Sequence, residues 1–172
     1  MPIVVFDLEG VLIDNSRRLR YALGIVGARS VEELSYPRKS RFWKIFLDEN
    51  LARRMDTVNI RGLMILADRS LAYKIVVVSG APERIVKEHL KKIKEEAERR
   101  GISIRIDRVF FRRRTREKAP DFKERILKLL MTKDEIVEVH DDDERVLQRV
   151  KKYGIRCILW KNLRPISWWP PF

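Results

Sequence analysis

Three apolar stretches of this 172-residue chain run directly into polar side chains that are able to do chemistry. The stretches are IVVF (3–6), KIVVVS (74–79) and EIVEVH (135–140). The polar residues and glycines at their ends are Asp7, Glu9 and Gly10; Ser79 and Gly80; and Asp141 and Asp142. In an open α/β sheet, ligands bind beyond the carboxyl ends of the strands. The sequence therefore predicts that three strands bring these groups to one edge of a sheet.

A cluster of carboxylates at one edge favours a divalent cation. Asp7, Asp141 and Asp142 would repel one another at close range unless a positive charge lay between them. Oxygen ligands of this type suit Mg²⁺, which keeps several waters and shares its shell with substrate phosphates. Ser79 and Gly80 can offer a hydroxyl and backbone N–H groups to phosphate oxygens. The pattern thus predicts a magnesium site that holds a phosphate ester.

The elements that must position these residues alternate along the chain. Further apolar, β-branched runs lie at 102–111 and 155–160, and stretches with helical periodicity lie at 83–100, 122–131 and 144–154. Strands that alternate with helices of this length predict a parallel sheet covered on both faces. We therefore expect one α/β domain over residues 1–172, with a Rossmann-like parallel sheet of about five strands and helices on both faces.

The segment between the first two predicted strands is too long for one crossover helix. Helical patterns lie at 16–26 and 40–55, and a further one at 60–72 leads back to the sheet. Residues 14–58 are therefore expected to form a small helical insertion beside the sheet. Its aromatic residues Phe42, Trp43 and Phe46 are expected to form the core of the insertion itself.

The motifs at the strand ends resemble those of the haloacid dehalogenase superfamily of phosphohydrolases. VVFDLEGVLID matches the family's first motif, VVVSG the second and VEVHDD the fourth, and a lysine precedes the fourth. The resemblance implies Mg²⁺ as cofactor, and inserted helices in this superfamily commonly form a cap, so 14–58 is a candidate cap.

This resemblance also implies a role for each motif residue. Asp7 would be the nucleophile and Glu9 the general acid and base, and the cation would be held by Asp7, the backbone carbonyl of Glu9 and Asp141, with Asp142 in support. Ser79 and Gly80 would bind the phosphate. Position 9 is usually aspartate in the family, so glutamate here is a departure, and it leaves open whether this chain has full activity.

The region before the fourth motif is similar to the phosphatase domain of polynucleotide kinase/phosphatase. FFRRRTREKAPDFKERILKLL followed by VEVHDD carries that similarity. It implies a phosphate contact for Arg112. The motif lysine is either Lys118 or Lys123, and we favour Lys123 because a position in the first turn of a packed helix fixes its reach.

The charge of the chain leaves two interpretations open. The formal net charge is +13 and the isoelectric point is about 10.2. Such a balance favours a polyanionic partner such as nucleic acid, and it is equally typical of a heat-adapted surface rich in Lys and Arg. The densest basic run consists of Arg112, Arg113, Arg114 and Arg116. A nucleic-acid contact and a solvated loop are equally good interpretations of that run.

Three classes of function follow from these observations. The leading hypothesis is a Mg²⁺-dependent phosphatase that acts on a nucleic-acid 3′-phosphate. The alternatives are a phosphatase for small phosphomonoesters and a non-catalytic nucleic-acid-binding protein. No apolar run approaches membrane-spanning length, and the single cysteine, Cys157, allows no disulfide within the chain, so we expect a cytoplasmic protein. The oligomeric state and the role of the tail around Trp168 and Trp169 are left open.

Three further polar residues are expected to have structural roles. His140 is favoured as a structural residue beside Asp141, and His89 as a histidine in the core or at its boundary. Asp143 is expected to cap the helix that starts near Glu144.

Overall fold

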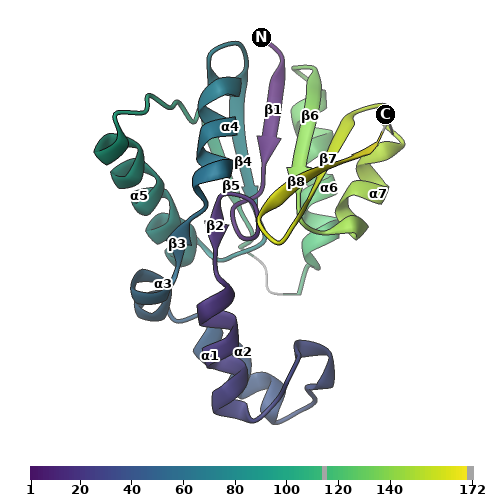
Figure 1. Cartoon of the computed structure of the whole chain (residues 1–172). Coiled ribbons are helices and arrows are strands. Elements are labelled where there is room, and N and C mark those ends of the chain that lie inside the picture. Colours follow the sequence, from purple (N-terminus) through teal and green to yellow (C-terminus); the bar gives the residue numbers. More distant parts are fainter. Residues whose placement is uncertain (114–115, 170–172) are drawn as a thin grey trace.

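A computed structural model of the chain describes residues 1–113 and 116–169, and it contains one large sheet flanked by helices (Figure 1). The strands of this sheet are β1 (Ile3–Phe6), β4 (Lys74–Ser79), β5 (Arg108–Phe111), β6 (Ile136–Asp141), β7 (Arg156–Lys161) and β8 (Arg164–Trp169). Their order across the sheet is β5-β4-β1-β6-β7-β8. The first five are parallel and β8 is antiparallel to β7, so the prediction of a parallel α/β sheet is confirmed.

Two parts of the sheet differ from the sequence prediction. The strand predicted at 102–111 is shorter, because only 108–111 pair with β4, although Ile102, Ile104 and Ile106 still pack against the core. The sixth strand, β8, was not predicted. It follows β7 through a tight turn at Asn162 and Leu163, which have φ angles of 51° and 61°. Tight β-hairpins favour glycine or asparagine at such positions. Because leucine stands at position 163, the sequence gives no clear indication of the turn.

Four helices cover the two faces of the sheet: α4 (Ile60–Ser70), α5 (Glu83–Arg100), α6 (Ala119–Met131) and α7 (Glu144–Lys151). Alternate residues of β1 point to opposite faces. Val4 and Phe6 pack with side chains of α4 and α5, and Ile3 and Val5 pack with α6 and α7. Burial on both faces explains why the central strands read as continuous apolar runs. Among the described residues, no helix is both long and apolar enough to cross a membrane.

The insertion after the first strand is carried on a two-stranded ribbon. Its helices are α1 (Ser16–Val26), the short 3₁₀ turn η1 (Val31–Glu33), α2 (Arg38–Phe46) and α3 (Glu49–Met55), and its ribbon strands are β2 (Ile13–Asp14) and β3 (Thr57–Val58). The insertion has a separate core that includes Phe42 and Phe46. Figure 1 shows α1 and α2 beyond the carboxyl ends of the large sheet's strands, on the side where the predicted site lies. That the insertion acts as a cap stays a prediction.

Helix α4 fixes the loop that follows β1. A Cβ atom on Gly62 would lie 2.3 Å from the carbonyl oxygen of Val11, so glycine alone allows this approach. The same carbonyl accepts a hydrogen bond of 2.8 Å from the side chain of Asn59, and the backbone N–H of Asn59 donates to the carbonyl of Leu12. The loop that carries Glu9 and Gly10 is therefore held against the start of a helix.

This contact generates a matched pair of substitutions. Gly62→Ala should lower the free energy of unfolding by about 1–3 kcal/mol, because backbone must shift to make room for one methyl group. Gly24→Ala in α1 should raise it by about 0.5–1 kcal/mol, since no atom apart from the neighbouring residues and the helix's own backbone lies within 4 Å of the added carbon and alanine favours helix. Urea denaturation of both variants measures the difference. A stable Gly62→Ala variant would contradict the close packing of α4 on this loop.

Candidate active site

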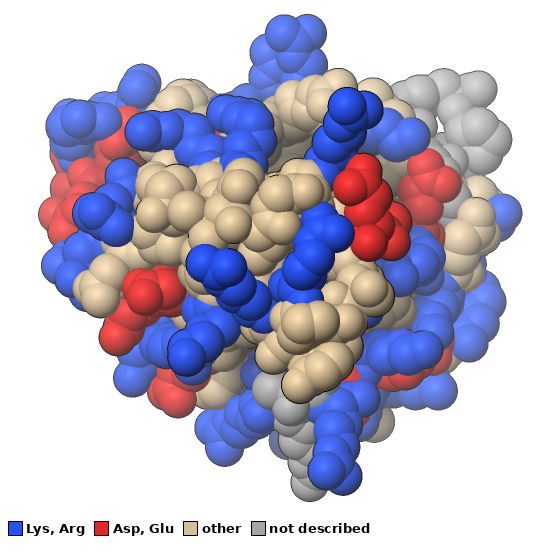
Figure 2. Space-filling model, turned by 90° about the horizontal axis from the view of Figure 1, so that it is seen from below, with Lys and Arg blue, Asp and Glu red and all other residues tan. Residues whose placement is uncertain are grey.

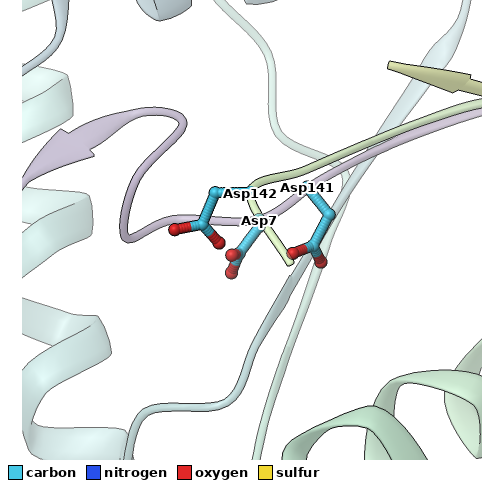
Figure 3. A group of neighbouring side chains, drawn as sticks. All are labelled: Asp7, Asp141 and Asp142. Atoms are coloured by element: carbon cyan, nitrogen blue, oxygen red, sulfur yellow. The ribbon is translucent and has the colours of Figure 1, made fainter. Parts of the chain in front are cut away.

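Three carboxylates meet at the carboxyl ends of two neighbouring strands (Figure 3). Asp7 directly follows β1, Asp141 is the last residue of β6, and Asp142 comes next. One oxygen of each carboxylate lies within 4.8 Å of the others. Asp7 and Asp141 are buried, while Asp142 is exposed at the rim. The convergence follows from the register, because Phe6 pairs with His140 and the next residues of both strands emerge side by side.

Lys123 is the cation that the fold itself supplies to this cluster. Its Nζ lies 2.7 Å from Oδ2 of Asp141 and 3.1 Å from Oδ2 of Asp7. The lysine stands in the first half of α6 and is buried. Against the effect of burial, the Asp141 and Asp7 carboxylates raise the pKa of Lys123 above its ordinary value, so it is fully charged.

One lysine does not balance three carboxylates. Burial raises the pKa of Asp7 well above its usual value, Lys123 opposes the rise, and Asp141 and Asp142 add to it. Partial removal from water and the charge of Asp141 raise the pKa of Asp142 to about 7, against the effect of Lys123. For both groups removal from water is the largest cause of the raised pKa, and the neighbouring carboxylates add to it. A further positive charge among the three carboxylates would favour their ionised forms.

The residues present fit an oxygen-ligated divalent cation. Three carboxylates offer the hard oxygen ligands that Mg²⁺ prefers. Gly10 makes room for one of them: its φ is +85°, and a Cβ atom there would lie 2.1 Å from Oδ2 of Asp142. The loop after β1 can therefore approach the Asp142 carboxylate only because position 10 is glycine.

Glu9, the predicted acid and base, points to the insertion. Its Oε2 accepts hydrogen bonds from Nη2 of Arg18, at 2.8 Å, and from the side-chain amide of Asn15. The sequence analysis did not single out Arg18 or Asn15. A signal for Arg18 exists, because Arg18, Ala22 and Val26 lie on the buried face of α1 and a charged residue there calls for a partner.

The phosphate-binding residues predicted from the second motif lie beside this cluster. Ser79 is the last residue of β4, which pairs with β1, and its side chain is buried. Its Oγ accepts a 3.1 Å hydrogen bond from the backbone N–H of Ala81. Gly80 follows, and its carbonyl accepts a 2.9 Å bond from Nε of Arg112. Their binding of phosphate stays a prediction.

Arg112 acts as a brace between two loops. Besides Gly80, it donates 2.7 Å to the carbonyl of Glu117, so it joins the loop after β4 to the segment before α6. A phosphate contact for Arg112 stays a prediction. Arg113 and Arg116 are exposed, whereas Arg114 lies outside the described residues.

A buried aromatic layer lies directly behind the carboxylates. The ring of His140 stacks on Phe6 at 4.4 Å, and the indole N–H of Trp160 donates 2.9 Å to its Nδ1. Because indole can only donate, Nδ1 is an acceptor and the proton is on Nε2, which faces Glu138. Burial lowers the pKa of His140, in agreement with a neutral ring. His140 therefore supports Asp7 and Asp141 from behind, the structural role expected of it.

Solved structures match the chain, although no protein-family model and no curated protein sequence does. A haloacid dehalogenase-like hydrolase from Streptococcus pneumoniae superposes with a TM-score of 0.66 and 14% identity, over 91% of this chain and 83% of that chain. A dehalogenase with an intermediate complex matches with a TM-score of 0.63 and 14% identity, over 99% and 89%. The chain has the haloacid dehalogenase-like fold.

A third match comes from an RNA repair assembly. A chain of the Pnkp1/Rnl/Hen1 RNA repair complex superposes with a TM-score of 0.62 and 18% identity, over 92% of this chain and 42% of that chain. The haloacid dehalogenase-like fold thus confirms the resemblance seen in the motifs at the level of the fold. The positions of the two candidate lysines differ. Lys118 is exposed and lies before α6, whereas Nζ of Lys123 contacts the carboxylates of Asp7 and Asp141. This geometry favours Lys123 as the motif lysine.

The raised pKa of Asp142 leads to a prediction for stability. A carboxyl whose pKa is raised by folding stabilises the protein at low pH, and this contribution is lost as pH rises through about 7. The metal-free protein should therefore gain more melting temperature from MgCl₂ at pH 8 than at pH 5. Asp142→Asn should raise the melting temperature in EDTA at pH 8 and reduce the gain from MgCl₂.

The control for this experiment is Glu98→Gln, which removes one exposed carboxylate of α5 and should behave like the parent. Thermal unfolding followed by circular dichroism gives all the values. If MgCl₂ stabilises Asp142→Asn as much as the parent at pH 8, Asp142 does not face the cation.

Proposed function

We propose that this protein is a Mg²⁺-dependent phosphohydrolase that cleaves phosphate monoesters through an aspartyl-phosphate on Asp7. The observation that carries the proposal is the convergence of Asp7, Asp141 and Asp142 at the carboxyl edge of the sheet, where Lys123 contacts Asp7 and Asp141. Asp7, Asp141, Asp142 and the backbone carbonyl of Glu9 would hold the cation, which would stabilise negative charge on the phosphoryl oxygens.

The side chains of the site then divide the reaction into two displacements. Asp7 attacks phosphorus, the bond to the ester oxygen breaks, and Glu9 gives that oxygen a proton. Water next attacks the aspartyl-phosphate, Glu9 takes a proton from it, and inorganic phosphate leaves with Asp7 restored. Asp7 is held for attack by the backbone N–H of Leu8, 2.8 Å from its Oδ1, and by Lys123 at its Oδ2.

The fold does not decide which bond is cleaved, since one matching structure is a dehalogenase. The site residues favour phosphate. A departing halide needs neither a proton donor nor a cation, whereas an alkoxide leaving group and a phosphoryl dianion need both. The three clustered carboxylates and Glu9 supply what the second reaction requires.

A nucleic-acid 3′-phosphate is the substrate we propose within this class. Figure 2 views the molecule from the end that carries the insertion, where Lys and Arg atoms lie across and around an uncharged area. Within the insertion, a hollow is lined by Arg41, Lys44 and Arg54 together with the exposed Tyr21 and with Asp48. None of the three basic side chains makes an ion pair within the described residues. Free cations beside an exposed aromatic ring suit a single-stranded backbone.

A small phosphomonoester is the alternative substrate, and the position of the insertion favours it. Helices α1 and α2 lie at the carboxyl edge of the sheet, where a cap would enclose a small molecule.

Two further observations support the nucleic-acid substrate over the small phosphomonoester. The chain matches a chain of an RNA repair complex, and its net charge is +13.

The nucleophile is tested by Asp7→Asn, which keeps the shape and removes the attacking charge. Hydrolysis of p-nitrophenyl phosphate in the presence of MgCl₂ should fall by at least about a thousandfold. Asp68→Asn, an exposed change on α4, is the control and should keep parental turnover. Near-normal activity of Asp7→Asn would exclude the aspartyl-phosphate mechanism, and hydrolysis of 2-haloacids in place of phosphate esters would reassign the reaction.

The substrate is tested by phosphate release from 3′-phosphorylated oligonucleotides beside sugar, nucleotide and amino-acid phosphates. For the oligonucleotides, binding should weaken with salt. The double substitution of Arg41 and Arg54 by serine should reduce the slope of log K against log salt by about 1.4, since each contact on a single strand contributes about 0.7. The same substitution of exposed Lys128 and Lys133 is the charge-matched control. If the parent protein shows no salt-dependent binding of oligonucleotides, the nucleic-acid substrate is excluded and the small phosphomonoester becomes the proposed substrate.

A further inference from the structure

Glu9 is held by only one of its two carboxylate oxygens. Arg18 and Asn15 both donate to Oε2, and among the described residues no group bonds Oε1. The Glu9 side chain is 20% exposed, so solvent and a ligand can reach it. A carboxyl group anchored in this way has a fixed orientation and keeps one oxygen for a proton.

The side chain of Arg18 is held in one orientation by its own contacts. Its Nε donates 3.0 Å to Oδ1 of Asp56, its Nη1 donates 2.6 Å to the carbonyl of Phe46, and its Nη2 lies 3.0 Å from Oδ2 of Asp56. The guanidinium also lies over the ring of Phe46, at 4.3 Å from its centre. Arg18 is fully buried, and each of its three nitrogens has a partner. A planar group with these bonds presents the remaining N–H of Nη2 in one direction.

Asp56 is in turn fixed by the main domain. Nε2 of His89, a buried residue of α5, lies 2.7 Å from Oδ2 of Asp56. Asp56 lies between α3 and β3, while Arg18 lies in the first turn of α1, shortly after β2. A continuous chain of side-chain contacts therefore runs from the buried residues His89, Asp56 and Arg18 to Glu9.

We infer that Arg18 and Asn15 are the positioning residues of the acid and base, and that position 9 is glutamate because its additional methylene group reaches them. The inference rests on the proposed function. Aspartate at position 9 would be one bond shorter and would lose the bonds to Arg18 and Asn15. With glutamate, Oε2 accepts the bonds from Arg18 and Asn15, and Oε1 is left to exchange a proton with the leaving oxygen and with water.

The test compares a substrate that needs protonation with one that does not. Proton donation raises the rate of hydrolysis of an alkyl phosphate, which has a poor leaving group, by about 10²–10⁴-fold, and it raises that of p-nitrophenyl phosphate little. Asn15→Ala and Glu9→Asp should lower kcat for glycerol phosphate by about tenfold or more, and that for p-nitrophenyl phosphate by less than about threefold. Arg18→Met should show the same selectivity with a larger loss. Arg17→Met, an exposed neighbour, is the control.

A double variant separates positioning from a general effect on the fold. Adding Arg18→Met to Glu9→Gln should not change the ratio of the two substrates further, because the group that Arg18 positions is already disabled. Equal losses on both substrates in Asn15→Ala and Glu9→Asp would overturn the inference and leave Arg18 as a support of the insertion. These two variants decide the matter even if Arg18→Met does not fold.

The outcome for the proposed function is read separately. If the parent hydrolyses p-nitrophenyl phosphate and Asp7→Asn does not, the nucleophile stands whatever the ratios show. A parent inactive on both substrates would overturn the proposed function and this inference together.

Discussion

The repulsion among Asp7, Asp141 and Asp142 is the constraint on which the rest of the structure depends. Parallel strands bring their carboxyl ends together, so placing these residues after β1 and at the end of β6 brings one oxygen of each carboxyl group within 4.8 Å of the others. Lys123 offsets part of that cost, while burial, with a smaller contribution from the neighbouring carboxylates, keeps the pKa values of Asp7 and Asp142 raised. In the function we propose, a divalent cation would offset the remaining negative charge of the carboxylates, and a phosphate ester would in turn supply oxygens to that cation.

Rigid surroundings keep the carboxylates from moving apart. Behind them, Arg69 and His140 donate to Glu138, and against the effect of burial they lower its pKa to about 2, so a charged group is held inside the sheet. In front, Gly10 allows the loop after β1 to touch Asp142. Buried polar contacts of this kind require their groups to lose hydrating water. They occur where a fold must hold functional groups in a fixed arrangement.

Features that depend on local sequence pattern were predictable from the sequence, whereas side-chain contacts between distant residues were not. Strand-end residues were predictable because the ends of parallel strands share one edge, and the helix cap at Asp143 followed from its residue type. His89 was expected in the core, where it lies, yet its partner Asp56 is 33 residues away and no periodicity connects them. Strand β8 was missed because its turn uses Leu163, a residue that tight turns seldom contain.

The departure at position 9 acquires a physical meaning from these long-range contacts. The insertion rests on α5 through Arg53 and Glu88 and through Asp56 and His89. Because Arg18 joins Asp56 to Glu9, the carboxylate that we propose as the proton donor and the insertion share one support. A ligand that moved the insertion would therefore also move Glu9, and one that held the insertion would hold Glu9 in place. Aspartate at position 9 would lack this connection, so in our proposal glutamate is the residue that would couple the position of the insertion to proton transfer.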